Sequence, residues 1–120
     1  MVAIDAALIE TFDRDGFAVV KDFFDPVELQ FFGSIVDRAV INRVGPDTRS
    51  IDAKSMYEQS FQQCMNLWED NDDLKALTFN QSLAKTAGAL LGAKALRIWH
   101  DQALYKEPGG RETDPHQDCC

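Results

Sequence analysis

The sequence predicts a single α+β domain, and two features of its apolar pattern lead to that class. Four or five stretches repeat apolar residues at three- and four-residue steps, which is typical of helices, and they occupy most of residues 1–93. Two or three short runs rich in branched and aromatic residues favour strands, and the clearest lies within residues 94–120. At 120 residues the chain is long enough for one domain with one modest core.

The N-terminal part predicts two helices with a strand between them. Residues 5–12 mix apolar and acidic residues in a helical rhythm that a glycine ends, and FAVVKDFF at residues 17–24 has the composition and length of a strand. A second helix is expected over residues 26–43. Asp25 can cap it, a proline suits its first position, and Glu28 can complete a capping box.

The middle of the chain predicts a loop followed by three further helices. Residues 47–55 are polar and unpatterned, which favours a loop. Residues 56–68 carry aromatic and apolar side chains at helical spacing, and a short helix is expected over residues 74–77. Residues 82–91 are strongly helical and end at Gly92, which can serve as a C-terminal cap.

The last quarter of the chain combines a strand, a glycine turn and a His-x-Asp pair. A strand over residues 96–106 sends alternate side chains to opposite faces. One face then carries three polar groups among apolar ones, in the order Leu96, Ile98, His100, Gln102, Leu104 and Lys106. The strand stops at a Glu-Pro-Gly-Gly sequence, which predicts a turn.

After this turn, Pro115 disfavours a helical conformation at Asp114 and keeps the approach to His116 extended. On an extended segment His116 and Asp118 project to the same side, so an imidazole and a carboxylate can hold one divalent ion together. A facial non-haem iron(II) centre uses two histidines and one carboxylate. The pair supplies two of these three ligands, although the spacing taken alone favours a surface histidine and a turn aspartate.

Composition limits the partners and the location. Twelve basic and twenty acidic residues give a formal charge of −8, which argues against nucleic acid and against an anionic membrane as partners. The first residues lack the basic start and apolar run of a signal peptide, and no stretch reaches membrane-spanning length. These features predict a cytoplasmic protein.

The three cysteines are too few for a disulfide scaffold. Cys64 lies among apolar residues and is expected to be a buried thiol. Cys119 and Cys120 together with His116 could form a zinc or copper site. Structural zinc ligands are normally two to four residues apart, however, whereas these two thiols are adjacent.

Several segments together resemble the phytanoyl-CoA dioxygenase family. They are FDRDGFAVVKDFFDPVEL near the start, NLWE in the middle, SLAKTAGALLGAKALRIWHDQ after it, and then HDQALYKEPGG and TDPHQD. The resemblance extends over residues 8–118 and covers the N-terminal half of the family's fold. It implies an iron(II)- and 2-oxoglutarate-dependent oxygenase built on a double-stranded β-helix, a jelly-roll related to cupins, here with an incomplete barrel.

The resemblance also implies roles for particular residues. His116 and Asp118 match the first two iron ligands of the family. Gln102 matches a strand position that can contact 2-oxoglutarate, and Lys106 is a second candidate for attracting that co-substrate. The implied reaction hydroxylates a small-molecule substrate, and it is coupled to the oxidative decarboxylation of 2-oxoglutarate to succinate.

The sequence departs from the family at several places. Pro115 stands where an aromatic residue usually precedes the ligand histidine. The second histidine ligand and the arginine that anchors 2-oxoglutarate belong to the half that the resemblance does not cover. The chain alone is therefore expected to be a truncated or partial enzyme without activity, with open sheet edges that favour self-association. The alternatives are a non-catalytic, helix-rich binding module and the zinc or copper site described above.

Overall fold

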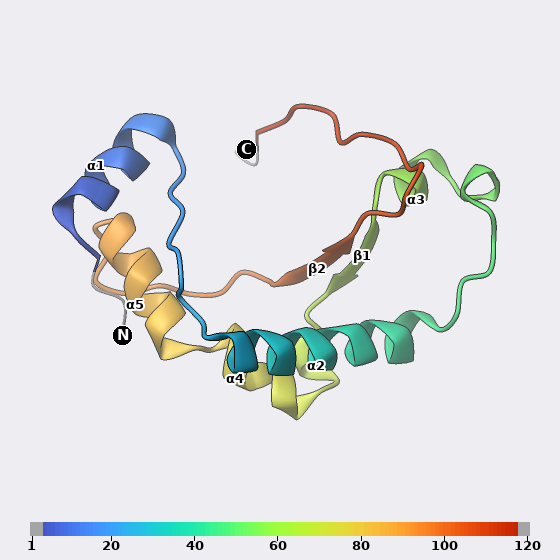
Figure 1. Cartoon of the computed structure of the whole chain (residues 1–120), viewed down its shortest axis with the longest axis horizontal. Coiled ribbons are helices and arrows are strands. Elements are labelled where there is room, and N and C mark those ends of the chain that lie inside the picture. The colour runs from blue at the N-terminus through green and yellow to red at the C-terminus, as the bar shows by residue number, and fades with distance from the viewer. Residues whose placement is uncertain (1–3, 118–120) are drawn as a thin grey trace.

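The computed structural model describes residues 4–117. Figure 1 shows that helices dominate and that two short strands form the only sheet within this range. The α-helices of these residues are α1 (Ala6–Asp15), α2 (Pro26–Val44), α3 (Met56–Ser60), α4 (Lys75–Thr78) and α5 (Gln81–Leu90). The strands are β1 (Gln62–Met65) and β2 (Gln102–Tyr105), and short 3₁₀ turns are η1 (Ile51–Ala53), η2 (Leu67–Glu69) and η3 (Asp72–Leu74).

Helices α1, α2 and α5 form where the sequence predicts them, because each has a side-chain cap at its start. Asp5 accepts a hydrogen bond from the backbone N–H of Leu8, and Asn80 caps α5 in a similar way. The predicted capping box of α2 is present, since Asp25 accepts from the N–H of Glu28 and the Glu28 carboxylate accepts from the N–H of Asp25.

Two predicted elements are wrong. Residues 17–24 do not form a strand, because no second segment of the described chain bonds to their backbone, and the chain turns at Asp22 with a φ of 55°. Residues 56–68 are not one helix. Helix α3 ends at Ser60, Phe61 adopts an extended φ of −168°, and the chain continues as β1 and then η2.

Strands β1 and β2 pair antiparallel, with Gln62 opposite Tyr105 and Met65 opposite Gln102. The predicted strand over residues 96–106 is thus shorter than expected, since only Gln102–Tyr105 bonds in a ladder. Residues 94–101 join α5 to this strand without a helical turn (Figure 1). The observed architecture is a helix-rich chain with a small antiparallel sheet, and residues 4–117 do not form a double-stranded β-helix.

The core lies between one face of α2, strand β1 and the turns that follow it. Its buried apolar side chains are Ile35, Ala39, Val40, Cys64, Leu67 and Leu74. The prediction that Cys64 is buried is confirmed. Arg43, near the end of α2, bonds the carbonyl of Met65 and the carboxylate of Asp70, which joins the helix to the end of β1. At the other end of the molecule α1 packs against α5 (Figure 1).

Among the helices of residues 4–117, none combines the length and the apolar character needed to cross a membrane.

Candidate functional site

Strand β2 presents Gln102 on its solvent-facing side. Ala103 and Tyr105 are half-buried toward the core, whereas Gln102 and Leu104 are exposed, as the two-residue period of a strand requires. The Gln102 amide nitrogen lies 2.6 Å from Nε2 of His100. An amide nitrogen only donates, so Nε2 of His100 accepts and its ring proton resides on Nδ1. The two polar side chains that the sequence places on one face therefore contact each other.

The predicted turn after β2 is confirmed. The N–H of Gly110 donates to the carbonyl of Glu107 at 3.1 Å, and Gly109 has a φ of 76°. Proline at the second position and a positive φ at the third are the pattern of a type II turn, which only glycine adopts without strain. The turn redirects the chain from the strand toward α3.

Helix α3 holds the segment that leaves this turn. The N–H of Arg111 donates to the carbonyl of Gln59 at 2.8 Å, and the hydroxyl of Ser60 contacts the carbonyl of Glu112 at 3.4 Å. Gly110 permits this close approach, because a Cβ added there would lie 2.5 Å from the Gln59 carbonyl oxygen. The start of the segment that carries His116 is therefore fixed against α3.

Lys106 takes part in the same attachment. Its ammonium group lies 3.0 Å from the carbonyl oxygen of Ser60 and 3.3 Å from that of Arg111. The predicted contact of Lys106 with 2-oxoglutarate stays a prediction. In this structure the charge is directed to two main-chain oxygens, and it stabilises the turn and its attachment to α3.

The buried Lys54 side chain contacts the first residue of this turn, Glu107. The Lys54 side chain is 5% exposed, and its ammonium lies 2.7 Å from Glu107 and 3.4 Å from Asp47. Arg49 extends the network, at 2.8 Å from Asp47 and 2.7 Å from Glu58. The loop over residues 47–55 is thereby joined both to the end of β2 and to α3.

These contacts explain the direction of the local pKa shifts. Hydrogen bonds from Arg49 hold the pKa of the Asp47 carboxyl well below its usual range, and they lower the pKa of Glu58 to about 2 with further help from Ser55. The bond to Glu107 raises the pKa of Lys54. The shifts of Asp47, Arg49, Lys54 and Glu58 all favour the charged form of these side chains.

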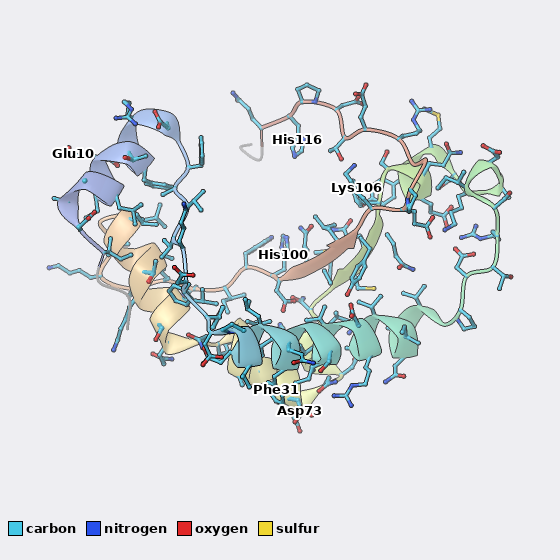
Figure 2. All side chains as sticks on the ribbon, in the orientation of Figure 1. Glu10, Phe31, Asp73, His100, Lys106 and His116 are labelled. Atoms are coloured by element: carbon cyan, nitrogen blue, oxygen red, sulfur yellow. The ribbon has the colours of Figure 1, made fainter. Side chains whose placement is uncertain are left out.

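His116 lies on the exposed segment that follows, which forms neither helix nor strand. Its Nδ1 is 2.8 Å from the carbonyl oxygen of Asp114, an arrangement in which Nδ1 carries the ring proton and donates. Figure 2 shows the His116 ring projecting toward the side of the molecule on which His100 and β2 lie. A groove of about 470 Å³ separates this segment from α3, lined among others by Tyr57, Phe61 and His116.

The donor chemistry of the segment fits part of an iron site. Histidines that bind metals usually donate their other ring nitrogen to a carbonyl or carboxylate, as His116 does to Asp114. The second predicted ligand, Asp118, lies outside the described residues, as do Cys119 and Cys120. Within residues 4–117, no three His, Cys, Asp or Glu side chains lie close enough to hold a metal ion.

Comparison with known families decides which group the chain belongs to. The model of the family described as "Phytanoyl-CoA dioxygenase (PhyH)" matches residues 12–119. The chain belongs to the phytanoyl-CoA dioxygenase family. The match includes every residue singled out above for iron or co-substrate binding, and it relates the protein to iron(II)- and 2-oxoglutarate-dependent dioxygenases. Searches of curated proteins and of solved structures each gave no significant match.

Sequence reasoning missed the residues that support the His116 segment in this family member. Lys54 lies in a polar stretch, where a single lysine gives no sign that it is buried. Gln59 and Ser60 act through backbone carbonyls, which any residue provides. The only local signal is Gly110, since the second of two consecutive glycines can mark a close approach of two backbone segments.

Proposed function

We propose that this chain supplies part of the catalytic centre of an iron(II)- and 2-oxoglutarate-dependent hydroxylase that acts on a small molecule in the cytoplasm. In this proposal His116 and Asp118 are iron ligands, and Gln102 and Lys106 contact 2-oxoglutarate. Membership of the phytanoyl-CoA dioxygenase family supports it. The structural observation that supports it is the contact between Nδ1 of His116 and the Asp114 carbonyl, on a segment whose start is attached to α3.

Iron bound together with 2-oxoglutarate would supply the oxidising chemistry for hydroxylation of a C–H bond. The residues of this chain bind and orient. The Asp114 carbonyl fixes the orientation of the His116 ring, and the bond between Arg111 and Gln59 fixes the segment that precedes it. Gln102 offers an amide on the exposed face of β2, where a carboxylate can accept its N–H.

We propose further that the 120-residue chain alone does not catalyse this hydroxylation. The sequence contains two histidines, and Nε2 of His100 accepts a hydrogen bond from Gln102. A facial site needs two histidine ligands and one carboxylate, so a second imidazole has to come from outside this chain.

Anaerobic titration of the purified chain with iron(II) tests the ligand assignment. We expect weak binding that His116→Ala and Asp118→Asn each reduce by about tenfold or more, as for the loss of one ligand. His100→Ala is the matched control, since it removes the other histidine and should leave the affinity for iron unchanged. Equal binding by the wild-type protein and His116→Ala would overturn the assignment.

A succinate assay with iron(II), 2-oxoglutarate and oxygen tests the second part of the proposal. We expect no succinate above the background of free iron, and robust formation of succinate by the pure chain would refute this part alone. Tight zinc binding that is lost on Cys119→Ser and Cys120→Ser would favour the zinc site instead. The absence of any metal binding would favour a non-catalytic binding module.

A further inference from the structure

His100 and Gln102 form a polar pair at the start of β2. The Gln102 side-chain nitrogen lies 2.6 Å from Nε2 of His100, and the ring is half-buried whereas Gln102 is exposed. Within the described part of the chain, this ring has no other hydrogen bond and takes part in no ion pair. Figure 2 shows His100 on the side of the molecule to which His116 projects. The orientation of the Gln102 amide therefore depends on one partner, the His100 imidazole.

The neutral imidazole holds the amide with its nitrogen toward the ring. Nε2 of the neutral ring is an acceptor, so it receives one of the two N–H groups of the Gln102 amide. Because the amide is planar, its carbonyl oxygen then points away from the ring, and one N–H is left for another acceptor. A carboxylate that approaches Gln102 from the exposed side therefore meets one donor and one repulsive oxygen.

Protonation of the ring reverses these roles. Both nitrogens of an imidazolium are donors, so Nε2 no longer accepts from the Gln102 nitrogen. At 2.6 Å two facing donors repel, and rotation of the amide brings its carbonyl oxygen to the ring instead. Both N–H groups of the amide then point away from the ring. Histidine is the side chain whose charge changes between about pH 5 and pH 8, so the reversal falls within a physiological range.

The charged groups of the neighbouring segments have other contacts. On β1 the side chains that share this face are Met65 and Gln63, and neither carries a charge. On the segment that carries the ring, Arg97 lines a groove against α5, and the Asp101 carboxylate accepts from a threonine hydroxyl at 2.7 Å. Lys106, farther along β2, directs its ammonium to main-chain oxygens. The Gln102 amide is thus the group that responds directly to the charge of the ring.

We propose that His100 is a positioning residue, which sets how Gln102 presents its amide to 2-oxoglutarate. This inference rests on the proposed function, in which Gln102 contacts that co-substrate. With a neutral ring a carboxylate of 2-oxoglutarate accepts one N–H, and with a protonated ring it accepts two. The affinity of the site for 2-oxoglutarate therefore rises as the pH falls through the titration of the ring, although His100 contacts neither iron nor co-substrate.

Nuclear magnetic resonance of the isotope-labelled chain tests the reversal of the amide without iron or 2-oxoglutarate, so its outcome does not depend on the proposed function. At about pH 8 we expect the His100 proton on Nδ1, together with Overhauser contacts between the ring and the Gln102 amide protons. At about pH 5 these contacts should disappear, and the amide signals should shift with the midpoint of the ring. The side-chain amide of Gln63, which contacts the Tyr57 hydroxyl, is the matched control and should not shift. Gln102 signals and contacts that stay constant with pH overturn the proposal.

Two variants assign this effect to one ring. His100→Phe keeps an aromatic ring without nitrogen, so the Gln102 signals should lose their pH dependence. His116→Ala removes the other histidine of the chain and should leave that dependence unchanged. Circular dichroism shows that each variant is folded. A pH dependence that persists in His100→Phe and is lost in His116→Ala would overturn the proposal.

Anaerobic calorimetric titration of the iron(II)-loaded chain with 2-oxoglutarate tests the consequence for binding. His100→Lys is the reference, because its ammonium donates to the Gln102 carbonyl at every pH in this range while all other titrating groups are kept. Between about pH 8 and pH 6, the affinity of the wild type should rise about tenfold more than that of His100→Lys, since it gains a hydrogen bond to a charged carboxylate. Equal pH dependence of the two proteins overturns the role of His100. If neither protein binds 2-oxoglutarate although the amide reverses with pH, the contact of Gln102 in the proposed function is wrong, and the role of His100 in co-substrate binding falls with it.

Discussion

At the scale of single residues, Gly110 is the glycine at which an added side chain would meet the closest contact. A Cβ at this position would lie 2.5 Å from the backbone oxygen of Gln59 and 3.0 Å from that of Glu107. We expect Gly110→Ala to lower the free energy of unfolding by about 1–3 kcal/mol, the usual cost of forcing a methyl group into an occupied space. Urea denaturation followed by circular dichroism measures the change.

Gly33 provides the control for this substitution. It lies within α2, where an added Cβ meets no atom within 4 Å. Gly33→Ala should raise the free energy of unfolding by roughly 0.5–1 kcal/mol, because alanine is the better helix former. Equal effects of the two substitutions would show that the Gly110 backbone does not pack closely against α3.

Tyr105 provides a prediction about pH. Burial, together with the hydrogen bond to Asp37, raises the pKa of its phenol from 10.0 to about 12. A raised pKa favours the protonated form in the folded state. The stabilisation is therefore complete below pH 10 and is lost as the pH rises toward 12. Ultraviolet titration of tyrosinate should show one late-ionising group in the wild type that is missing in Tyr105→Phe. A wild-type curve identical in shape to that of the variant would contradict the burial of this phenol.

At the scale of elements, Lys54 attaches the loop over residues 47–55 to the turn that precedes the C-terminal segment. Its ammonium bonds Glu107, at the start of the turn that leads to α3. We expect Lys54→Met to speed amide hydrogen exchange at residues 107–112, since the turn loses its charged anchor. Exchange measured by mass spectrometry provides the test.

Lys75→Met is the matched control for Lys54. Lys75 pairs with Asp72 three residues away on the surface, and its side chain is half exposed. Removing a surface pair of this kind has little effect on stability, so residues 107–112 should exchange as in the wild type. If both variants speed exchange equally, the effect comes from the lost charge and not from the anchor.

The sequence predicts elements well where their ends carry local signals. Asp25 and Glu28 define the start of α2, because capping depends on residues within one turn. The helix expected over residues 82–91 forms as α5, and Asn80 caps it. The Glu-Pro-Gly-Gly turn follows from local chemistry in the same way. These parts of the fold could be predicted from short stretches alone.

The errors occur where distant contacts decide the structure. In residues 56–68 the apolar residues Phe61 and Met65 are four apart, a spacing that fits a helix but is also two periods of a strand. Pairing of Cys64 with Ala103, far along the chain, selects the strand. Residues 17–24 have a strand composition, but without a neighbouring segment to bond them they remain irregular.

The candidate site was predicted in part for the same reason. The extended approach to His116, expected from the effect of Pro115 on its direct neighbour, stays a prediction, and residues 111–117 form neither helix nor strand. The support of that segment by α3 and Lys54 depends on contacts between residues far apart in the sequence, for which no local pattern exists. Asp118 lies outside the described residues, so its position as a ligand stays a prediction.

At the scale of the whole molecule, the chain is extended. Its radius of gyration is 16.8 Å, whereas a compact domain of this length has about 14 Å. Its accessible surface is 9352 Å², compared with roughly 6,500 Å² for a compact protein of this mass. Large apolar side chains on several elements remain exposed as a result.

This shape predicts unequal stability along the chain. Helix α2 buries Ile35, Ala39 and Val40, whereas α1 and α5 pack on each other and contain no fully buried residue. We expect backbone amides in α1 and α5 to exchange with solvent about tenfold faster than those in the middle of α2. Hydrogen exchange resolved by residue tests this, and equal protection of the three helices would show that they unfold as one unit.

The attachment of α3 to the C-terminal segment has one more consequence. Tyr57 and Phe61 stack edge to face at 5.0 Å and line the same groove as His116. A displacement of the segment that carries His116 would therefore change the surroundings of this aromatic pair. The near-ultraviolet circular dichroism of Tyr57 would then report on the position of a segment to which Tyr57 is not bonded.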